Sequence, residues 1–290
     1  IIPAFGTTLA IEEKLNNIGI AIHKYNTTCP FVEKVWNRSE QIAKKKYTVV
    51  VHGKPTHEET RATFSHASAH TATIIVNDMD DAIALGKYIS GEKKLTDFNN
   101  EFAGKFTTGF NPAKDLERIG VVNQTTMLAS DTQEISDFLK NIMQKKYSLD
   151  ESSVESHFAD TRDTLCYATY DNQTAVYGLL ETGAQLAIVV GGYNSSNTSH
   201  LVELCEKKFP TYFINDEEKI ISSNCIRHYD FHNKTELTTA GFLPQGEVTK
   251  ILLTSGASCP DALVEGVIEK LHSFFSGGRP IEAVRKEFTQ

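Results

Sequence analysis

The chain has 290 residues, which is long enough for two or three domains of ordinary size. Its composition, with 40% hydrophobic and 23% charged residues, is typical of a globular fold. The formal net charge of −8 argues against a non-specific nucleic-acid binder, so an anionic ligand must be held by local donors. No apolar run approaches the roughly 20 residues of a membrane span, and we expect no membrane partner.

Cysteine usage points to a reducing compartment, because the five cysteines are odd in number and widely spaced. None of them forms a Cys-x-x-Cys pair, so the spacing of a zinc finger is absent. The chain begins Ile1-Ile2-Pro3, which resembles the end of a strand, and it shows no signal peptide of the usual three-part kind. We therefore expect an N-terminal segment to precede residue 1.

The hydrophobic pattern predicts strands and helices that alternate along the chain. Strands are expected at residues 20–23, 47–51, 73–76, 119–122, 154–158, 186–190, 211–214 and 249–253. Helices are expected at residues 9–15, 80–89, 172–180 and 217–221, and from residues 30, 130, 201 and 261 onward. Two stretches, 91–116 and 227–246, are expected to be polar and irregular.

Two of these helices carry local signals of their ends and of their buried faces. Ser130 and Gln133 have the spacing of a capping box at the start of a helix. The apolar residues of that helix recur at helical spacing and are expected in the core: Ile135, Phe138, Leu139, Ile142 and Met143. The helix after Asp261 is expected to bury Leu263, Val264, Val267, Ile268 and Leu271.

One unit recurs along the sequence: a strand ends in a loop of Thr, Ser, Asn, Gln or Cys, and a helix begins there. It occurs at residues 20–36, 119–139, 186–208 and 249–271, and less clearly at 154–180. This alternation predicts an α/β fold with parallel sheets. Because each polar loop lies at the carboxyl end of its strand, the loops could form one pocket for a phosphate-like ligand.

Three stretches carry candidate chemistry. Pro30 suits the first position of a helix, so Cys29 would lie at the helix N-terminus, where thiolate is favoured; plain packing is the alternative. The stretch from His52 to Thr60 holds two His and two Glu, which could bind a metal or an anion or transfer protons, or could be solvated loop residues. The polar stretch between Gly191 and Leu201 could hold a phosphate-like group or simply cap a helix.

Six motifs occur in chain order: Thr28-Cys29-Pro30-Phe31-Val32-x-Lys34-Val35, His57-Glu58-Glu59-Thr60, Asn123-Gln124-Thr125-Thr126-Met127, Thr164-Leu165-Cys166-x-Ala168-Thr169, Asn194-Ser195-Ser196-Asn197 and Ser255-Gly256-Ala257-Ser258. Together they resemble the 4-hydroxy-3-methylbut-2-enyl diphosphate reductase family, and the resemblance covers nearly the whole chain. Four variants resemble its plant and cyanobacterial branch: Pro3-Ala4-Phe5-Gly6, Lys45-Lys46-Tyr47, His57-Glu58-Glu59-Thr60 and Val190-Gly191-Gly192.

The resemblance implies three similar α/β units with mostly parallel sheets around a central cavity that holds a 4Fe–4S iron–sulfur cluster. On this basis we expect a remainder of the first unit at 1–29, a second unit at 30–160, a third at 161–260, and a C-terminal helix and tail at 261–290. Cys29 and Cys166 would be two of three cluster ligands. The third is expected upstream of residue 1, because the family's first ligand motif is absent here, and Cys259 is a weaker internal candidate.

The activity implied is the reductive dehydroxylation of 4-hydroxy-3-methylbut-2-enyl diphosphate to isopentenyl and dimethylallyl diphosphate. Ferredoxin or flavodoxin would donate the electrons, in the cytoplasm of a bacterium or in a plastid. Carried over by motif, His57 would bind the diphosphate, Glu59 would deliver protons, and Thr125 would hold that relay in line. The remaining diphosphate ligands would be Ser195, Ser196, Asn197 and Ser258. A second diphosphate-binding His of many bacterial members would fall at Phe5, so that contact is absent or replaced.

Two rival functions come from other classes. A metal-dependent hydrolase could use His52, His57 and Glu59 as ligands, and its metal binding would survive loss of Cys29. A non-catalytic module for phosphorylated metabolites would bind diphosphate without any cluster. The presence or absence of iron and sulfide separates the reductase from both.

Overall fold

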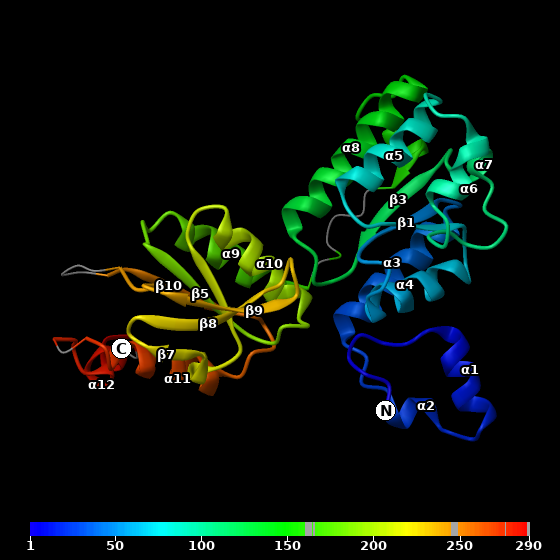
Figure 1. Ribbon diagram of the computed structural model, residues 1–290. Helices are drawn as coiled ribbons and strands as arrows, with labels where there is room; N and C mark the ends of the chain where they lie inside the picture. The colour runs from blue at the N-terminus through cyan, green and yellow to red at the C-terminus, as the bar shows by residue number, and fades with distance from the viewer. Residues whose placement is uncertain (160–163, 165, 245–248, 276, 289–290) are drawn as a thin grey trace. The chain divides into compact units, whose positions relative to one another are not determined.

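The computed structural model describes residues 1–159, 164, 166–244, 249–275 and 277–288. Two compact units divide the chain, residues 1–167 and residues 168–290 (Figure 1). The expected boundary between residues 160 and 161 lies outside the described residues, and the finer division of the chain stays a prediction. Within the described part, no helix is both long and apolar enough to cross a bilayer.

The first unit is built on a parallel sheet with the strand order β2-β1-β3-β4. Its strands are β1 (Thr48–His52), β2 (Thr73–Val76), β3 (Ile119–Asn123) and β4 (Phe158–Ala159). Its longer helices are α1 (Leu9–Asn17), α3 (Pro30–Lys44), α4 (Glu58–Ser68), α5 (Met79–Ser90) and α8 (Ala129–Tyr147). Single turns fill the connections: α2 (Ile22–Tyr25), η1 (Leu95–Asp97), α6 (Phe98–Glu101), α7 (Pro112–Asp115) and η2 (Val154–Ser156).

Helices cover both faces of this sheet, which is why every residue of β1 is buried (Figure 1). Side chains alternate between the faces along each strand. Val50 joins a core with Leu85 of α5 and Leu139 of α8, whereas Val49 and Val51 join a second core with Val35 of α3. The strands are therefore continuous apolar runs, as the sequence predicted.

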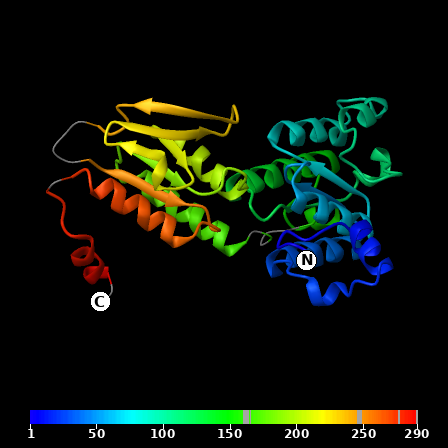
Figure 2. The same ribbon diagram turned by 60° about the horizontal axis from the view of Figure 1, so that its bottom comes forward.

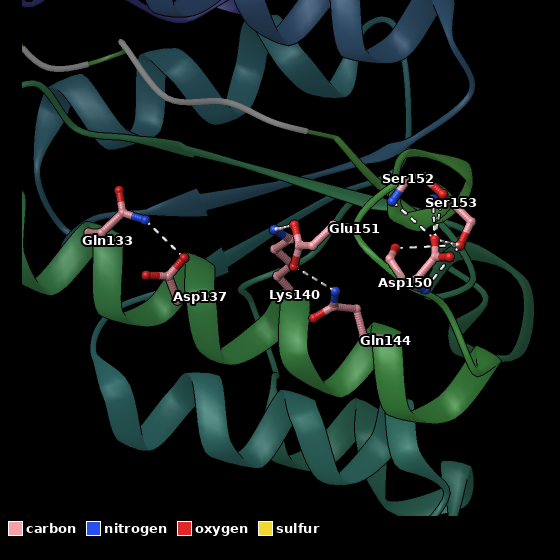
Figure 3. Close-up of polar contacts among 8 residues, drawn as sticks. All are labelled: Gln133, Asp137, Lys140, Gln144, Asp150, Glu151, Ser152 and Ser153. Atoms are coloured by element: carbon pink, nitrogen blue, oxygen red, sulfur yellow. Dashed lines mark hydrogen bonds and ion pairs between the residues drawn. The ribbon is translucent and has the colours of Figure 1, made fainter.

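Helix α8 buries Ile135, Leu139 and Met143 of its expected stripe, while Phe138 and Ile142 are partly buried against the same core. Its exposed face is tied to the loop that follows it (Figure 3). Lys140 Nζ and Gln144 Nε2 both donate to the Glu151 carboxylate, at 2.7 and 3.0 Å. In the same loop the Ser153 and Ser152 hydroxyls donate to Asp150 and lower its pKa to about 2. These contacts hold the connection to β4 against the helix.

The second unit contains two sheets of different kinds. A parallel sheet has the order β10-β5-β6, formed by β5 (Leu186–Val190), β6 (Thr211–Ile214) and β10 (Ile251–Ser255). An antiparallel sheet is inserted in the chain between β6 and β10, formed by β7 (Ile220–Ser222), β8 (Cys225–Asp230) and β9 (Thr235–Ala240). The helices are α9 (Tyr167–Leu180), α10 (Ser196–Glu206), η3 (Glu217–Lys219), α11 (Asp261–His272) and α12 (Ile281–Phe288).

Helix α11 lies along the parallel sheet of the second unit (Figure 2). Ile188 of β5 shares one core with Val267 and Leu271 of this helix. Ile268, which was expected in that core, is 40% exposed instead. The buried face of α11 is thus narrower than its apolar content suggested.

Several expectations about local structure were wrong. Residues 217–221 form η3 and the first two residues of β7 instead of one short helix. Residues 20–23 contain the start of α2 instead of a strand, and residues 227–246 hold most of the β8–β9 hairpin instead of an irregular loop. The N-cap of α8 is Leu128, so Ser130 lies inside the first turn and does not cap the helix. Residues 154–158 form η2 and only the first residue of β4, because Val154 to Ser156 close a 3₁₀ turn.

Gly120 in β3 gives a test of the packing against α3. A Cβ at this position would lie 2.9 Å from Ala159 Cβ and 3.2 Å from Ile42 Cγ2. We expect Gly120→Ala to lower the free energy of unfolding by about 1–3 kcal/mol, because the strand and helix must move apart. Urea denaturation followed by circular dichroism measures this change.

Gly178 in α9 is the matched control, since a Cβ there meets nothing within 4 Å. Gly178→Ala should raise the free energy of unfolding by about 0.5–1 kcal/mol, as alanine favours a helix. Equal stability of the wild-type protein and Gly120→Ala would contradict the close packing at β3.

Candidate functional site

The candidate site of the first unit begins where two neighbouring strands end. In the parallel pair of β1 and β3, His52 lies opposite Asn123, and both are buried. The chain then continues from β1 toward α4 and from β3 into Gln124 and Thr125. Because the carboxyl ends of parallel strands share one edge, the two polar segments leave the sheet side by side.

The sequence suggested that Glu59 lies in a loop, but Glu59 belongs to the first turn of helix α4. His57 is the N-cap of α4, and its ring accepts a hydrogen bond from the Glu59 N–H. Glu59 is only 3% exposed, and its carboxylate accepts two hydrogen bonds from Thr125. The Thr125 backbone N–H donates at 2.5 Å and the Thr125 hydroxyl at 3.0 Å.

Burial raises the pKa of Glu59 to about 7, although both hydrogen bonds from Thr125 act to lower it. Desolvation has the larger effect because the charged carboxylate has lost its water and no cation in the described part of the chain acts on its pKa. A carboxyl group with a pKa near neutral can both hold and release a proton at physiological pH. This is the property that a general acid needs.

The hydrogen bond at His57 fixes which ring nitrogen carries the proton. A backbone N–H can only donate, so the Nδ1 atom that accepts from Glu59 N at 3.2 Å must carry a lone pair. The neutral ring then carries its proton on Nε2. Burial lowers the pKa of His57, which keeps this neutral form dominant. His57 therefore offers one N–H donor to an oxygen of a ligand.

Gln124 connects the two segments, a role that its place in the motif did not reveal. Its Oε1 atom accepts from the Thr60 hydroxyl at 2.8 Å and from Lys54 N–H at 3.2 Å. Its Nε2 atom donates to the Thr126 hydroxyl at 2.6 Å. The Thr60 side chain lies so close to Gly53 that a Cβ on residue 53 would be 2.5 Å from Thr60 Oγ1. Only glycine fits at that point without movement.

Cys29 lies at the start of a helix, as predicted. It is the N-cap of α3 with Pro30 in the first helical position, and its N–H donates to Ala4 O at 2.8 Å. Cys166 precedes α9, and the rings of Phe31 and Tyr167 pack with their centroids 5.0 Å apart. The segments that carry the two cysteines are therefore in contact.

The donor set at these two cysteines suits an iron–sulfur cluster. Both thiols are free and half-buried, and thiolate sulfur is the usual ligand of such clusters. The Thr164 hydroxyl, two residues before Cys166, donates to the Asn123 side chain and so ties this segment to the end of β3. Over the described ranges, no three His, Cys, Asp or Glu side chains are placed to hold a metal ion together.

The candidate site of the second unit lies at the end of β5. Helix α10 starts at Ser196 with Ser195 as its N-cap, five residues earlier than expected. The polar residues Ser196 and Asn197 are thus the first helical turn, where backbone N–H groups have no intrahelical acceptor. The Asn197 side chain is buried, and neither of its polar atoms has a partner among the described residues.

Ser258 lies on the loop after β10 and is exposed. In the parallel pair of β5 and β10, Ser255 lies opposite Val190, so the loop of Ser258 and the start of α10 leave the same edge of one sheet. The Gly256 N–H donates to Val190 O at 3.0 Å and closes this edge. A buried carboxamide with no partner among the described residues, at the N-terminus of a helix, is suited to bind an oxyanion.

The predicted site residues therefore form two groups. His57, Glu59, Thr125, Cys29 and Cys166 belong to the first unit, and Ser195, Ser196, Asn197 and Ser258 belong to the second. Within the first unit, hydrogen bonds join His57, Glu59 and Thr125 directly.

Known proteins resemble this chain over most of its length. The family model described as LytB protein matches residues 1–272. The 4-hydroxy-3-methylbut-2-enyl diphosphate reductase of Synechococcus sp. (strain RCC307) is 40% identical over 280 residues, 96% of this chain and 66% of that protein. The enzyme of the same name from Synechococcus sp. (strain CC9605) is 42% identical over 274 residues, 93% of this chain and 66% of that protein.

A solved structure shares the fold. The E-1-hydroxy-2-methyl-but-2-enyl-4-diphosphate reductase from Plasmodium falciparum aligns with a TM-score of 0.60 and 23% identity, over 92% of this chain and 64% of that one. The chain spans slightly under two thirds of the length of the cyanobacterial relatives it matches. The match to the family model, the cyanobacterial relatives and the α/β fold with parallel sheets agree with the predicted family and branch. The chain belongs to the LytB protein family.

Proposed function

We propose that the protein is a 4-hydroxy-3-methylbut-2-enyl diphosphate reductase. The substrate's allylic C–O bond breaks, two electrons and two protons are taken up, and the products are one water and isopentenyl or dimethylallyl diphosphate. The observation that carries the proposal is the buried Glu59 carboxyl, held by Thr125 and with its pKa raised to about 7. A poor leaving group such as hydroxide needs a proton donor that is loaded at neutral pH.

Cys29 and Cys166 would hold a 4Fe–4S cluster, since both thiols are free, half-buried and carried by touching segments. When bound, such a cluster passes on the electrons and supplies a Lewis acid for the departing hydroxyl group. The third thiolate remains a prediction for a position before residue 1. The three-unit arrangement around one cluster cavity is part of the same proposal.

The protein's own residues manage the protons. Glu59 in its protonated form donates toward the hydroxyl, and the hydrogen bonds from Thr125 fix the direction of the carboxyl group. Once Glu59 is ionised, the same two donors stabilise the carboxylate and ready it to take up the next proton. Gln124 holds Thr60 and Lys54 in place and keeps the α4 segment next to Thr125.

The diphosphate would be bound by neutral donors. His57 offers Nε2–H, and the first turn of α10 offers backbone N–H groups with the Ser195, Ser196 and Asn197 side chains. Ser258 would add a hydroxyl from the neighbouring strand end. This arrangement suits a protein of net charge −8, since a trianionic ligand meets fixed dipoles at short range.

The hydrolase alternative finds less support in the first unit. His57 Nδ1 is engaged by a backbone N–H, and both Glu59 oxygens are engaged by Thr125. His52 Nδ1 lies 2.9 Å from Thr132 Oγ1 and the ring is buried. Ligation of a metal by His57 would require the ring to lose either its Nε2 proton or its contact with Glu59 N–H, which argues against a metal site at these three residues.

The partner and the compartment complete the proposal. Reduction by single electrons calls for a one-electron donor, and ferredoxin or flavodoxin would serve. The protein would work in the cytoplasm of a bacterium or in a plastid, where the cluster's thiolates stay reduced.

Removal of either proposed cluster ligand gives the first test. We expect Cys29→Ser and Cys166→Ser, made in the complete protein and purified without oxygen, to lose most of their iron, sulfide and paramagnetic resonance signal. Cys225→Ser is the control, because Cys225 is another half-buried free thiol and lies in β8. Full iron content in Cys29→Ser would sink the reductase proposal, and loss in Cys259→Ser would place a ligand on the second unit.

Replacement of the proposed proton donor gives the second test. Glu59→Gln keeps the shape and the acceptor for Thr125 N–H but has no proton to release, so turnover should fall by about 100-fold or more. Cluster content should stay unchanged. Turnover close to that of the wild-type protein would remove Glu59 from the proposed mechanism.

The raised pKa of Glu59 also predicts how stability depends on pH. In the unfolded chain Glu59 ionises near its ordinary pKa of 4.5, while the folded state keeps the proton until about pH 7. The contribution of Glu59 to the free energy of unfolding is therefore largest below pH 4.5. It falls by on the order of 3 kcal/mol as the pH rises to 7. Urea midpoints of Glu59→Gln should lack this fall.

Glu58→Gln is the control for this pH series. Glu58 is the exposed neighbour of Glu59 and pairs with Arg61 at 2.9 Å. Its variant should show the same fall as the wild-type protein. If Glu59→Gln and the wild-type protein lose stability in parallel between pH 4.5 and 7, the carboxyl group is not desolvated in the folded state.

A further inference from the structure

A stripe of three polar residues runs along one face of α10 and begins in its first turn. Asn197, His200 and Glu203 are spaced by three residues, and residues at this spacing are neighbours on a helix surface. His200 is 4% exposed, although histidine is seldom buried so deeply without polar partners on both nitrogens. The proposed function gave roles to Asn197 but none to His200 or Glu203.

Glu203 fixes the orientation of the His200 ring. His200 Nδ1 lies 2.7 Å from Glu203 Oε2, so Nδ1 carries a proton and donates it to the carboxylate. The two nitrogens of an imidazole point in widely different directions, so Nε2 is directed away from Glu203. Helical side chains also lean toward the helix N-terminus, which places the ring on the side of Asn197.

His200 Nε2 is buried and has no partner among the described residues, and the same is true of both polar atoms of Asn197. Buried polar atoms in proteins are almost always paired. Two neighbouring residues with three such atoms, close to the N-terminus of a helix, therefore indicate a place that a ligand completes.

Thr198 has a different explanation, although its hydroxyl is also unpaired. A Cβ at Gly256 would lie 2.1 Å from Thr198 Oγ1, and one at Gly191 would lie 2.7 Å from it. The Thr198 side chain thus fills the space between the two glycines at the ends of β10 and β5. Asn197 and His200 remain as the ligand-facing pair.

We propose that His200 is a further diphosphate-binding residue, which donates Nε2–H to a phosphate oxygen of the ligand at the start of α10. Because Nδ1–H is already directed at Glu203, Nε2 donates only when the ring is protonated. The Glu203 carboxylate stabilises that imidazolium at Nδ1, and the phosphate stabilises it at Nε2. This inference rests on the proposed function for the presence of a diphosphate at this helix.

Two substitutions separate the nitrogens of His200. His200→Asn retains a donor near the position of Nδ1 and removes Nε2, whereas His200→Gln places an amide N–H near the position of Nε2. We expect the affinity for inorganic pyrophosphate, measured by calorimetry on the complete protein without oxygen, to fall about tenfold or more in His200→Asn. His200→Gln should recover most of that loss.

The matched control is His232, which lies between β8 and β9 and contacts the last residue of α10. His232 Nε2 lies 2.9 Å from Glu206, the last residue of α10, and this pair is largely exposed. His232→Asn removes a similar His–Glu contact without affecting the first turn. Pyrophosphate affinity should stay at the wild-type value.

A direct measurement keeps the proposal testable if a buried substitution unfolds the protein. Nitrogen-15 spectra of the wild-type imidazole rings should show the His200 Nε2 signal move to the protonated position when pyrophosphate is added. A His200 signal that does not move, or equal affinity of His200→Asn and the wild-type protein, would overturn the role of His200 and leave the reductase proposal standing. A wild-type protein that binds no pyrophosphate would overturn both.

Discussion

The contact between Glu59 and Thr125 is the interaction on which the candidate site depends. It joins the first turn of α4 to the segment after β3, across 66 residues of sequence. Because the carboxyl group is buried, its only strong polar partners in the described structure are the two donors of Thr125. The contact therefore sets the position of the group and moderates a pKa that burial alone would raise further. The neighbouring contacts of Gln124 with Lys54 and Thr60 keep these two segments together, and the His57 contact fixes the first turn of α4.

The second unit uses the same design with different donors. Its polar groups lie at the ends of β5 and β10, and most of them are hydroxyls, a carboxamide and helical N–H groups. Neutral donors suit a ligand whose charge does not change during a reaction, whereas the buried carboxyl group with its pKa raised to about 7 lies in the first unit. Under the proposed function the second unit contributes only binding groups, and the first unit contributes both a binding group, His57, and the proton donor.

The fold could be predicted from the sequence wherever a buried strand passed directly into a polar loop and a helix. The apolar runs around Val50, Val121 and Ile188 have no other explanation, and their strands lie where the pattern placed them. Helix α2 was missed because the short apolar run at residues 20–22 fits a helical turn as well as a strand. The hairpin of β8 and β9 was missed because nearly all of β9 is exposed, so its sequence has no apolar alternation to reveal it.

The site was predictable in its residue types but not in its connections. Motif spacing gave Glu59, Thr125 and Cys29, yet it placed Glu59 in a loop because the N-cap role of His57 has no distinctive pattern. Gln124 and His200 could not be ranked from sequence, since their significance lies in partners that are far away or missing. An unpaired buried atom is a property of three-dimensional packing, and a sequence pattern does not contain it.

The pairing of β1 with β3 affects which substitutions the site can accept. Val121 faces one core and Val122 the other, while Asn123, the next residue, begins the polar segment. A shift of β3 by one residue would place each valine in the core that is packed around the other, so close packing on both faces of the sheet opposes such an error. The alignment of Thr125 with Glu59 is thereby protected by residues that take no part in chemistry. Substitutions in the polar segment can then alter what the site binds or transfers without disturbing where it is built.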